Sequence, residues 1–364
     1  MKRKIKKALH NRRQKRKTVQ HENVPRITND TVAEHREQVI ENARKYIYPL
    51  KHSKHRIVLV SVGVLILAIT SFLAYCTIAL YKFQSNTTFL YKVSQVLPFP
   101  IARIDNQFVA YENYLFELRH YTHYYENQLQ VDFTNDEAKA QLDQFKNRAL
   151  QEIINEAYVK RLAKEHNVSV SEAEVNEEIE LARAQNRLGS EQQVLEDVIQ
   201  DYWGWSIDDF KRTLRQEILN RKVVQKLDTE TKERASAALA ELQGGADFAA
   251  VAQKYSDDDI TKANGGEYGF AIDRASREVP PRAIDALYSL EKGAYSEVID
   301  TGYSLEIVKV IDINGTKLRA AHISFMYKPI ETYINDLKDA TPARVYITLP
   351  EVPEQFIDEN NQNL

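Results

Sequence analysis

One uninterrupted apolar stretch constrains the layout of this chain more than any other feature. Residues Ile57 to Leu80 are apolar apart from small or hydroxyl side chains, over 24 positions, and about 20 such residues suffice for a helix to cross a bilayer core. A cleaved secretory signal would have a shorter apolar core, of about 7 to 15 residues, close to the N-terminus. Because 56 residues precede the stretch in a chain of 364, we predict one retained transmembrane helix over 57–81.

The charges on the two sides of this helix predict its orientation. Residues 1–56 hold 17 Lys/Arg against 5 Asp/Glu, although the net charge of the whole chain is −3. Lys51, Lys54 and Arg56 immediately precede the helix, whereas Lys82 is the only basic residue soon after it. Basic residues are retained on the cytoplasmic side. We therefore expect a single-pass cell-membrane protein with a cytoplasmic basic tail, 1–56, and extracytoplasmic domains.

The tail and the single cysteine leave alternatives open. The basic tail is expected to be a solvated segment that fixes the orientation of the helix, and anionic lipid headgroups or RNA are its alternative partners. Cys76 is the only cysteine, so no intrachain disulfide is possible. Leu73-Ala-Tyr-Cys76 loosely resembles a lipoprotein lipidation motif, but Tyr75 stands where that motif has a small residue. We expect the helix itself to be the anchor.

A mostly helical domain is predicted over 101–227, behind a juxtamembrane linker over 82–100. Hydroxyl and carboxylate pairs that cap helix N-termini occur at Thr134 with Glu137 and at Ser171 with Glu174. Further helices are expected from Ser190 and from Ser206 to Leu227. The first helix carries aromatic and apolar residues at spacings of three and four, which places them on one face: Tyr111, Tyr114, Leu115, Leu118, Tyr121 and Tyr125. That face is either core or a surface for client proteins.

Four ordered motifs in the second half of the chain support a strong family resemblance. They read Gly245-Ala-Asp-Phe248, Tyr255-Ser-Asp-Asp258, Gly265-Gly-Glu-Tyr-Gly269 and Leu290-Glu-Lys-Gly-Ala-Tyr-Ser296. The series resembles the parvulin-type (PpiC-like) peptidyl-prolyl isomerase domain. The resemblance implies an α+β domain with an antiparallel sheet over 228–349, followed by a polar tail over 350–364.

A more diffuse resemblance covers the helical domain. The segment that begins Ile101-Ala-Arg-Ile-Asp-Asn106 is similar to the opening of the N-terminal domain in SurA-type and PrsA-type chaperone foldases. Tyr202-Trp-Gly-Trp-Ser206 and the helix after it are similar to the last two helices of that domain. The predicted fold class is α+β, with one transmembrane helix, a SurA-N-like chaperone domain and a parvulin-like domain.

The parvulin-like domain lacks the strand with which that family begins. Leu227 leads almost directly into the next helix, and the missing segment is found at the other end, as the strand 317–325 with His322. Asn314-Gly315 before it suits the two-residue turn of a β-hairpin. First and last strands are antiparallel neighbours in the parvulin sheet, so we expect a circularly permuted domain. The alternative is that His322 begins a second parvulin domain, for which 42 residues remain.

The resemblance also implies catalytic residues. His322 matches the first-strand histidine, and Asp258 matches the acidic position that faces the amide being twisted. Thr301 matches a hydroxyl that supports the histidine. Glu306 stands where the family has a second histidine, which changes the partners available to His322.

The substrate pocket is expected to depart from the family pattern. Tyr268 matches an apolar wall position. Ala283 stands where the family has the aromatic floor of the proline pocket, so we consider Phe270 or Tyr288 as candidates to refill it. The sequence predicts no metal or cofactor, and it does not indicate an oligomeric state.

The predicted function follows from both resemblances. We expect a membrane-anchored peptidyl-prolyl cis/trans isomerase and chaperone whose partners are unfolded or proline-containing exported polypeptides, together with the lipid bilayer. Two alternatives stay open, because similarity of fold does not establish activity. One is a holdase that binds unfolded chains without catalysis, and the other is an envelope scaffold that uses the parvulin fold to bind a fixed partner.

Overall fold

The computed structural model describes residues 28–47, 53–133, 135–184 and 192–350. The chain divides into two compact units, 1–75 and 76–364, which are described separately. The basic residues of 1–27, predicted to form part of the cytoplasmic tail, lie outside the described residues.

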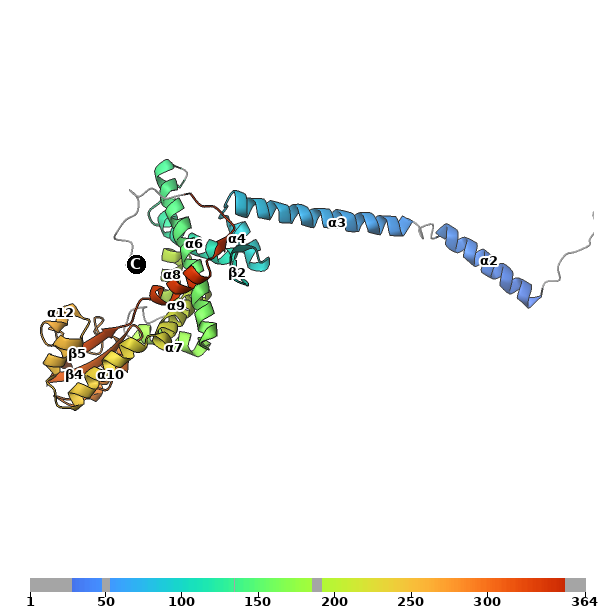
Figure 1. Ribbon diagram of the computed structural model, residues 1–364. Coiled ribbons are helices and arrows are strands. Elements are labelled where there is room, and N and C mark those ends of the chain that lie inside the picture. Colours follow the sequence, from blue (N-terminus) through green and yellow to red (C-terminus); the bar gives the residue numbers. More distant parts are fainter. Residues whose placement is uncertain (1–27, 48–52, 134, 185–191, 351–364) are drawn as a thin grey trace, which may run out of the picture. The chain divides into compact units, whose positions relative to one another are not determined.

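The described residues of the first unit form α2 (Asn29–Ile47) and most of α3 (Ser53–Thr77), both blue in Figure 1. The apolar side chains of α3 are exposed along its length, for example Val60 at 65% and Leu67 at 65%. Together with the turn that follows, the segment His55–Lys82 is long and apolar enough to cross a membrane. Its length and composition are thus those expected of the predicted transmembrane helix.

The second unit begins with residues that the sequence analysis assigned to the end of the membrane helix and to a linker. They form η1 (Ile78–Lys82) and α4 (Thr88–Val96), and α4 is capped by the side chain of Thr87. Leu80 and Leu90 are buried in the core of the helical domain, and the hydroxyl of Tyr111 donates to the carbonyl of Leu80 at 2.7 Å. Residues 82–100 are therefore part of the domain rather than a free spacer, because their apolar side chains pack into its core.

The helical domain continues with a short hairpin and five helices. Its elements are β1 (Pro100–Ile104), β2 (Gln107–Ala110), α5 (Tyr111–Asn127), α6 (Asp136–Glu165), α7 (Glu172–Ala184), α8 (Gln192–Trp203) and α9 (Ile207–Leu227). The capping pair Ser171 and Glu174 is confirmed, with hydrogen bonds of 2.8 and 3.3 Å between them. The helix before it, α6, differs from the prediction: it is capped by Asn135, whose side chain accepts from the backbone N–H of Ala138. Thr134 and Ser190 lie outside the described residues.

The aromatic face of α5 is the core of this domain. Tyr111, Tyr114, Leu115 and Leu118 are all fully buried. At the far end of the helix, the rings of Tyr121 and Tyr125 pack on Phe145 of α6, with centroids 5.6 and 4.9 Å apart. This face packs against protein along its length, so of its two interpretations the structure supports the core.

The end of the described chain returns to the helical domain. It forms α14 (Glu331–Ala340) and β6 (Arg344–Val345), and β6 pairs antiparallel with β1 to give the sheet order β2-β1-β6. Ile334 is buried in the same core as Tyr158, whose hydroxyl donates to the carbonyl of Thr341 at 2.6 Å. The sequence predicts that this segment belongs to the parvulin-like domain over 228–349. In the structure its apolar side chains pack instead into the core of the helical domain.

The intervening domain is built on an antiparallel sheet of order β3-β4-β5 (Figure 1). Its strands are β3 (Ile299–Asp300), β4 (Ser304–Asn314) and β5 (Lys317–Met326), and its helices are α10 (Thr229–Gln243), α11 (Phe248–Tyr255), α12 (Asp259–Lys262) and α13 (Pro281–Ser289). Alternate residues of β4 and β5 pack on opposite faces, as the two-residue period of a strand requires. Leu305 and Ile323 belong to the core with α10 and α11, whereas Val308 and Ala320 belong to the core with α13.

The predicted hairpin is present with its turn shifted by one residue. Asn314 pairs with Lys317, so the turn residues are Gly315 and Thr316. Gly315 has φ +61°, while Asn314 remains in the strand. A glycine at the first turn position is typical of a type II′ hairpin. The hairpin brings β5, with His322, beside β4.

Two connections between the domains meet at Asp228. Asp228 is buried, and it both ends α9 and caps α10. One carboxylate oxygen accepts from the N–H of Thr231 at 3.1 Å, and the other accepts from the N–H of Lys328 at 2.9 Å. Because Lys328 belongs to the second connection, this one carboxylate joins both crossing segments.

Candidate functional site

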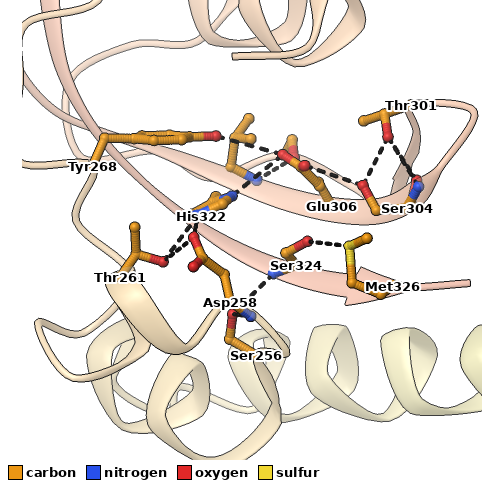
Figure 2. A network of polar contacts seen from close by, with 12 residues as sticks. Ser256, Asp258, Thr261, Tyr268, Thr301, Ser304, Glu306, His322, Ser324 and Met326 are labelled. Carbon is orange, nitrogen blue, oxygen red and sulfur yellow. Dashed lines mark hydrogen bonds and ion pairs between the residues drawn. The ribbon is translucent and has the colours of Figure 1, made fainter. Parts of the chain in front are cut away.

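A buried polar network lies on the β4–β5 hairpin (Figure 2). At its centre is His322 of β5, which is 6% exposed. Its Nε2 is 2.9 Å from Oδ2 of Asp258 and 3.0 Å from Oγ1 of Thr261. Its Nδ1 is 3.4 Å from Oε2 of Glu306, a longer contact whose effect is mainly electrostatic. The imidazole is thus held between two carboxylates.

Local structure places the two carboxylates. Asp258 is the N-cap of α12: its Oδ1 accepts from the N–H of Ile260 at 3.0 Å, and its Oδ2 accepts from the hydroxyl of Thr261 at 2.8 Å. Glu306 is paired with Ser324 across the hairpin, two residues from His322. Diagonal neighbours on one face of an antiparallel pair lie within reach of long side chains. The strand register therefore directs Glu306 toward the imidazole.

A glycine lets the loop before this sheet approach His322. The N–H of His322 donates to the carbonyl of Gly266 at 2.8 Å, and Gly266 has φ +85°. A Cβ atom at this position would lie 2.2 Å from the carbonyl oxygen of His322. Only glycine combines this dihedral angle with so close a contact. This explains one glycine of the motif Gly265-Gly-Glu-Tyr-Gly269.

The network extends in both directions from His322. On one side the ring of Tyr268 stacks on the imidazole, with centroids 4.2 Å apart and planes 25° apart, and its hydroxyl is 3.5 Å from Oε2 of Glu306. On the other side the hydroxyl of Ser304 donates to Oε1 of Glu306 at 3.2 Å, and the Oγ atoms of Thr301 and Ser304 are 2.8 Å apart. A continuous path of polar contacts therefore runs from Thr301 to Asp258.

The surroundings favour the charged form of both central groups. Burial lowers the pKa of His322, but Glu306 and Asp258 raise it by more, so the pKa lies above its ordinary value. Burial raises the pKa of Asp258, whereas hydrogen bonds from Thr261 and His322 lower it by more. Burial and the neighbouring Glu306 raise the pKa of Tyr268, so this phenol stays protonated. The imidazole of His322 thus lies between two carboxyl groups that favour its protonated form, with the phenol of Tyr268 stacked on it.

The network forms one wall of a cleft of about 570 Å³. The network residues that line it are Tyr268, Thr301, Ser304, Glu306 and His322, and Ser324 and Met326 adjoin them. The facing wall comes from α7 and α9, with Glu178, Leu181, Ile218, Arg221 and Lys222, and Pro280 and Pro281 add an apolar surface. A cleft of this size falls in the range of ligand pockets.

The structure brings together five of the eight predicted site residues. Asp258, Tyr268, Thr301, Glu306 and His322 belong to the network described above. The other three do not line the cleft. Ala283 is a fully buried residue of α13, Tyr288 donates to the carbonyl of Thr316 near the hairpin turn, and Phe270 is 41% exposed beside Tyr268.

Sequence reasoning missed three hydroxyl residues: Thr261, Ser304 and Ser324. Thr261 contacts both Asp258 and His322. The spacing Asp258-x-x-Thr261, which suits a helix N-cap, was a usable signal. Ser304 and Ser324 gave no such signal: neither stands in a recognisable motif.

The arrangement suits noncovalent catalysis. Nε2 of His322 contacts Asp258 and Thr261, and Nδ1 contacts Glu306, so the imidazole holds both carboxylates in place. Fixed charges and hydroxyls beside an apolar surface can stabilise a change in charge distribution on a bound molecule. No bond to that molecule needs to form.

Two family models match this chain. One, described as a SurA-like N-terminal domain, matches residues 50–224. The other, described as a PPIC-type PPIase domain, matches residues 218–312. The second match ends within β4, before the strand β5 that carries His322.

Relatives of this chain include isomerases and chaperones by name. It is 27% identical over 206 residues to the putative peptidyl-prolyl cis-trans isomerase YacD of Bacillus subtilis, covering 50% of this chain and 67% of YacD. It is 23% identical over 201 residues to the foldase protein PrsA of Halalkalibacterium halodurans, covering 45% and 59%. It is 36% identical over 94 residues to the periplasmic chaperone PpiD of Escherichia coli K12, covering 26% and 14%.

The matches therefore span most of YacD but less than two thirds of PrsA and a small part of PpiD. The SurA-like match covers the helices that form one wall of the cleft, and the PPIC-type match covers Asp258, Tyr268, Thr301 and Glu306. This chain combines a SurA-like N-terminal domain with a PPIC-type PPIase domain.

Proposed function

We propose that this protein is a membrane-anchored peptidyl-prolyl cis/trans isomerase that assists the folding of exported polypeptides. One observation carries the proposal: His322 and Glu306 line a large cleft, with Asp258 behind the imidazole, within and beside the segment that matches a PPIC-type PPIase domain. The names of the relatives, which include a foldase and a periplasmic chaperone, support the same class of substrate.

The reaction requires no covalent chemistry. Amide resonance opposes rotation about a peptide bond with a barrier of about 18–20 kcal/mol, and X-Pro bonds interconvert in tens to hundreds of seconds without a catalyst. An isomerase lowers this barrier by binding the twisted amide more tightly than the planar one. Pro280, Pro281 and Met326 offer apolar surface for the proline ring, and Ser304 and Tyr268 offer hydroxyls beside it.

The ionic contacts have a specific role in this proposal. His322 and its two carboxylates stay fixed while the substrate amide rotates, so the wall does not need to reorganise. Glu306 replaces the second histidine expected from the family, and its carboxyl group raises the pKa of His322 and so favours the protonated imidazole.

We also propose that the domain is circularly permuted. Three observations support this: the match to the PPIase domain ends before β5, β5 pairs with β4 through a short turn, and β5 carries the histidine that faces Asp258.

The test is isomerisation of an X-Pro peptide by the full-length protein in nanodiscs. We expect His322→Gln and Asp258→Asn each to reduce the catalysed rate at least about tenfold, since groups that stabilise charge in a site typically contribute that much or more. His166→Gln and Asp259→Asn are matched controls at exposed positions, and each should retain the rate within about twofold.

Failure would take either of two forms. A folded wild-type protein that does not accelerate isomerisation would contradict the proposal, as would site variants that match their controls. Binding of proline-free unfolded chains that survives His322→Gln would then favour the holdase.

The holdase has one structural observation in its favour. Tyr124 of α5 and Tyr202 of α8 stack with centroids 6.2 Å apart, and they are 37% and 51% exposed. Trp203, beside Tyr202 in the chain, is 37% exposed. Contiguous exposed aromatic side chains are a common feature of surfaces that bind other proteins.

The proposed location rests on α3 and on the charges around it. Residues 1–56 would be cytoplasmic and the second unit extracytoplasmic, by the bias of basic residues toward the cytoplasmic side. Protease added to intact cells or spheroplasts should then degrade the second unit and spare a fragment that contains the basic tail. Protection of the second unit would contradict this orientation.

A further inference from the structure

Residues on one face of α9 contact the turn at which the polar network begins. Glu217, Arg221 and Gln225 are spaced by four residues and so lie on one side of this helix. They contact the segment Asp300–Ser304, called here the β3–β4 turn, which lies in the other domain of the same unit. Each of the three makes a different kind of contact.

The contacts hold both the backbone and the side chains of the turn. The amide of Gln225 donates to Oδ1 of Asp300 at 3.1 Å and to the carbonyl of Gly302 at 3.4 Å. The hydroxyl of Tyr303 donates to the carboxylate of Glu217. The guanidinium of Arg221 lies over the ring of Tyr303, 4.9 Å from its centroid.

Arg221 is itself fixed from the other side. Its Nη1 is 3.0 Å from Oε1 of Glu178 on α7, and its side chain is 12% exposed. A Cβ atom at Gly302, which has φ +100°, would lie 3.2 Å from the same Nη1. The guanidinium therefore packs closely against the turn, in contact with both its backbone and its aromatic side chain.

The turn continues directly into the site. The hydroxyl and N–H of Thr301 donate to the carbonyl of Ser304, and the hydroxyl of Ser304 donates to Glu306. Glu306 in turn faces His322 at 3.4 Å. A shift of the turn would therefore move the group that holds Glu306 in place.

We propose that Glu217, Arg221 and Gln225 of α9 are positioning residues, which hold the β3–β4 turn so that Glu306 faces His322. The site is then assembled by two parts of the second unit: the domain of the β3-β4-β5 sheet supplies its groups, and helix α9 fixes one end of the network. The inference deepens the proposed function, because it concerns the same site, but it does not depend on turnover.

The alternative is that α9 merely attaches the two domains. The direction in which the pKa of His322 shifts when Arg221 is replaced separates positioning of the site from simple attachment of the domains. Removal of the Arg221 charge acts directly to raise the pKa of His322, because a nearby positive charge disfavours an imidazolium. Displacement of Glu306 acts in the opposite direction, since the imidazolium loses a carboxylate. Of the groups that face His322, Asp258 and Thr261 lie at α12 and Tyr268 in the loop before α13, so none of the three belongs to the turn.

The experiment is an NMR titration of the full-length protein in nanodiscs with ¹³C-labelled histidine rings. The chain has nine histidines, and the His322 signal is assigned by its loss in His322→Gln. We expect Arg221→Met to lower the pKa of His322 by at least about half a unit, a roughly threefold loss of proton affinity. Lys222→Met is the matched control, because it removes the same charge from the same cleft while its partner is Glu174. It should leave the pKa unchanged or slightly raised.

A second pair of variants keeps the formal charge constant. Tyr303 is 54% exposed, so its substitution should not unfold the domain. Tyr303→Leu removes both the ring under Arg221 and the hydroxyl on Glu217, and it should lower the pKa of His322. Tyr303→Phe keeps the ring but loses the contact with Glu217, so its pKa should lie between those of Tyr303→Leu and the wild type. A raised or unchanged pKa in Arg221→Met, or an unchanged pKa in Tyr303→Leu, would overturn the proposal. Because the experiment measures the pKa of His322 and not a catalytic rate, its outcome tests the positioning role independently of isomerase activity.

Discussion

Two regions of the second unit bury ionisable side chains with opposite results. On α5, burial and the nearby Glu152 and Glu156 raise the pKa of Glu117 to about 8, and burial with Arg148 and His123 lowers the pKa of His120 to about 4. At the hairpin, His322 is buried and Asp258 is half-buried, yet their partners shift both pKa values toward the charged form. Burial alone favours neutral groups, and only well-placed partners reverse that preference.

The geometry explains the difference. Nδ1 of His120 is buried and has no hydrogen-bond partner among the described residues, and its ring stacks on Trp205 with centroids 4.3 Å apart. His322 has a carboxylate on each side. His120 therefore packs against an aromatic ring, whereas the surroundings of His322 favour a charge that a binding site can use.

The largest expected effect is at Glu117. Its raised pKa means that the folded state holds a proton that the unfolded chain releases above about pH 4.5, so stability falls as pH rises from about 4.5 to 8. Glu117→Gln removes that penalty, and we expect a gain at pH 8 on the order of 4 kcal/mol in the free energy of unfolding.

Urea unfolding followed by tryptophan fluorescence measures this gain, because both tryptophans, Trp203 and Trp205, lie in the helical domain. Glu126→Gln, at an exposed position on the same helix, is the control and should change the pH dependence little. A flat difference between Glu117→Gln and the wild type from pH 5 to 8 would show that Glu117 has stabilising partners after all.

A smaller effect is expected at Glu306. The pKa of His322 is raised, so the stability from its charged contacts is fully present below about pH 6.5 and is lost as pH rises through the raised pKa. Glu306→Gln should cost about 2 kcal/mol at pH 6, as for loss of a hydrogen bond to a charged group, and less at alkaline pH.

Hydrogen exchange of β4 and β5 amides at several pH values measures this cost. Glu278→Gln removes a carboxylate from the lining of the same cleft and should have little effect on it. An equal cost of Glu306→Gln at pH 6 and at alkaline pH would mean that the imidazolium is not what Glu306 stabilises.

The smallest effect is expected at His120. Its lowered pKa means that the unfolded chain binds a proton below about pH 6.5 that the folded state does not bind until about pH 4. His120→Phe keeps a ring against Trp205 and removes the titrating group. Relative to wild type, we expect it to gain about 1 kcal/mol between pH 7 and pH 5, measured by the same fluorescence method. His166→Phe, at an exposed position, is the control and should show no such gain. If the stability of wild type and of His120→Phe changed equally between pH 7 and pH 5, His120 would not be held neutral by burial.

The sequence was sufficient for much of this arrangement because the relevant signals are local. The 3.6-residue period of α5 and the cap at Ser171 are encoded within a few residues. The strand with His322 was predictable because Asn314-Gly315 marks a turn, although the turn itself lies at Gly315 and Thr316. The approach of Glu306 to His322 followed from their family positions.

Long-range packing could not be predicted in the same way. Strand β6 has two residues, and nothing in them indicates pairing with β1 more than 200 positions earlier. Ala283, Phe270 and Tyr288 were considered for a pocket, but their positions relative to the cleft depend on how α13 packs on the sheet. The contacts between α9 and the β3–β4 turn likewise join residues about 75 to 86 positions apart in the sequence.

The return of α14 and β6 has a consequence for the order in which the protein is built. The PPIC-type domain is contiguous in the chain, from α10 to β5. The SurA-like domain instead needs Ile334 and Val345 to close its core and its sheet. During synthesis from the N-terminus, the inserted domain is complete while the domain that precedes it is still open. The earlier domain is thus the last to close, and its closure depends on the ribosome reaching a segment more than 100 residues beyond α9.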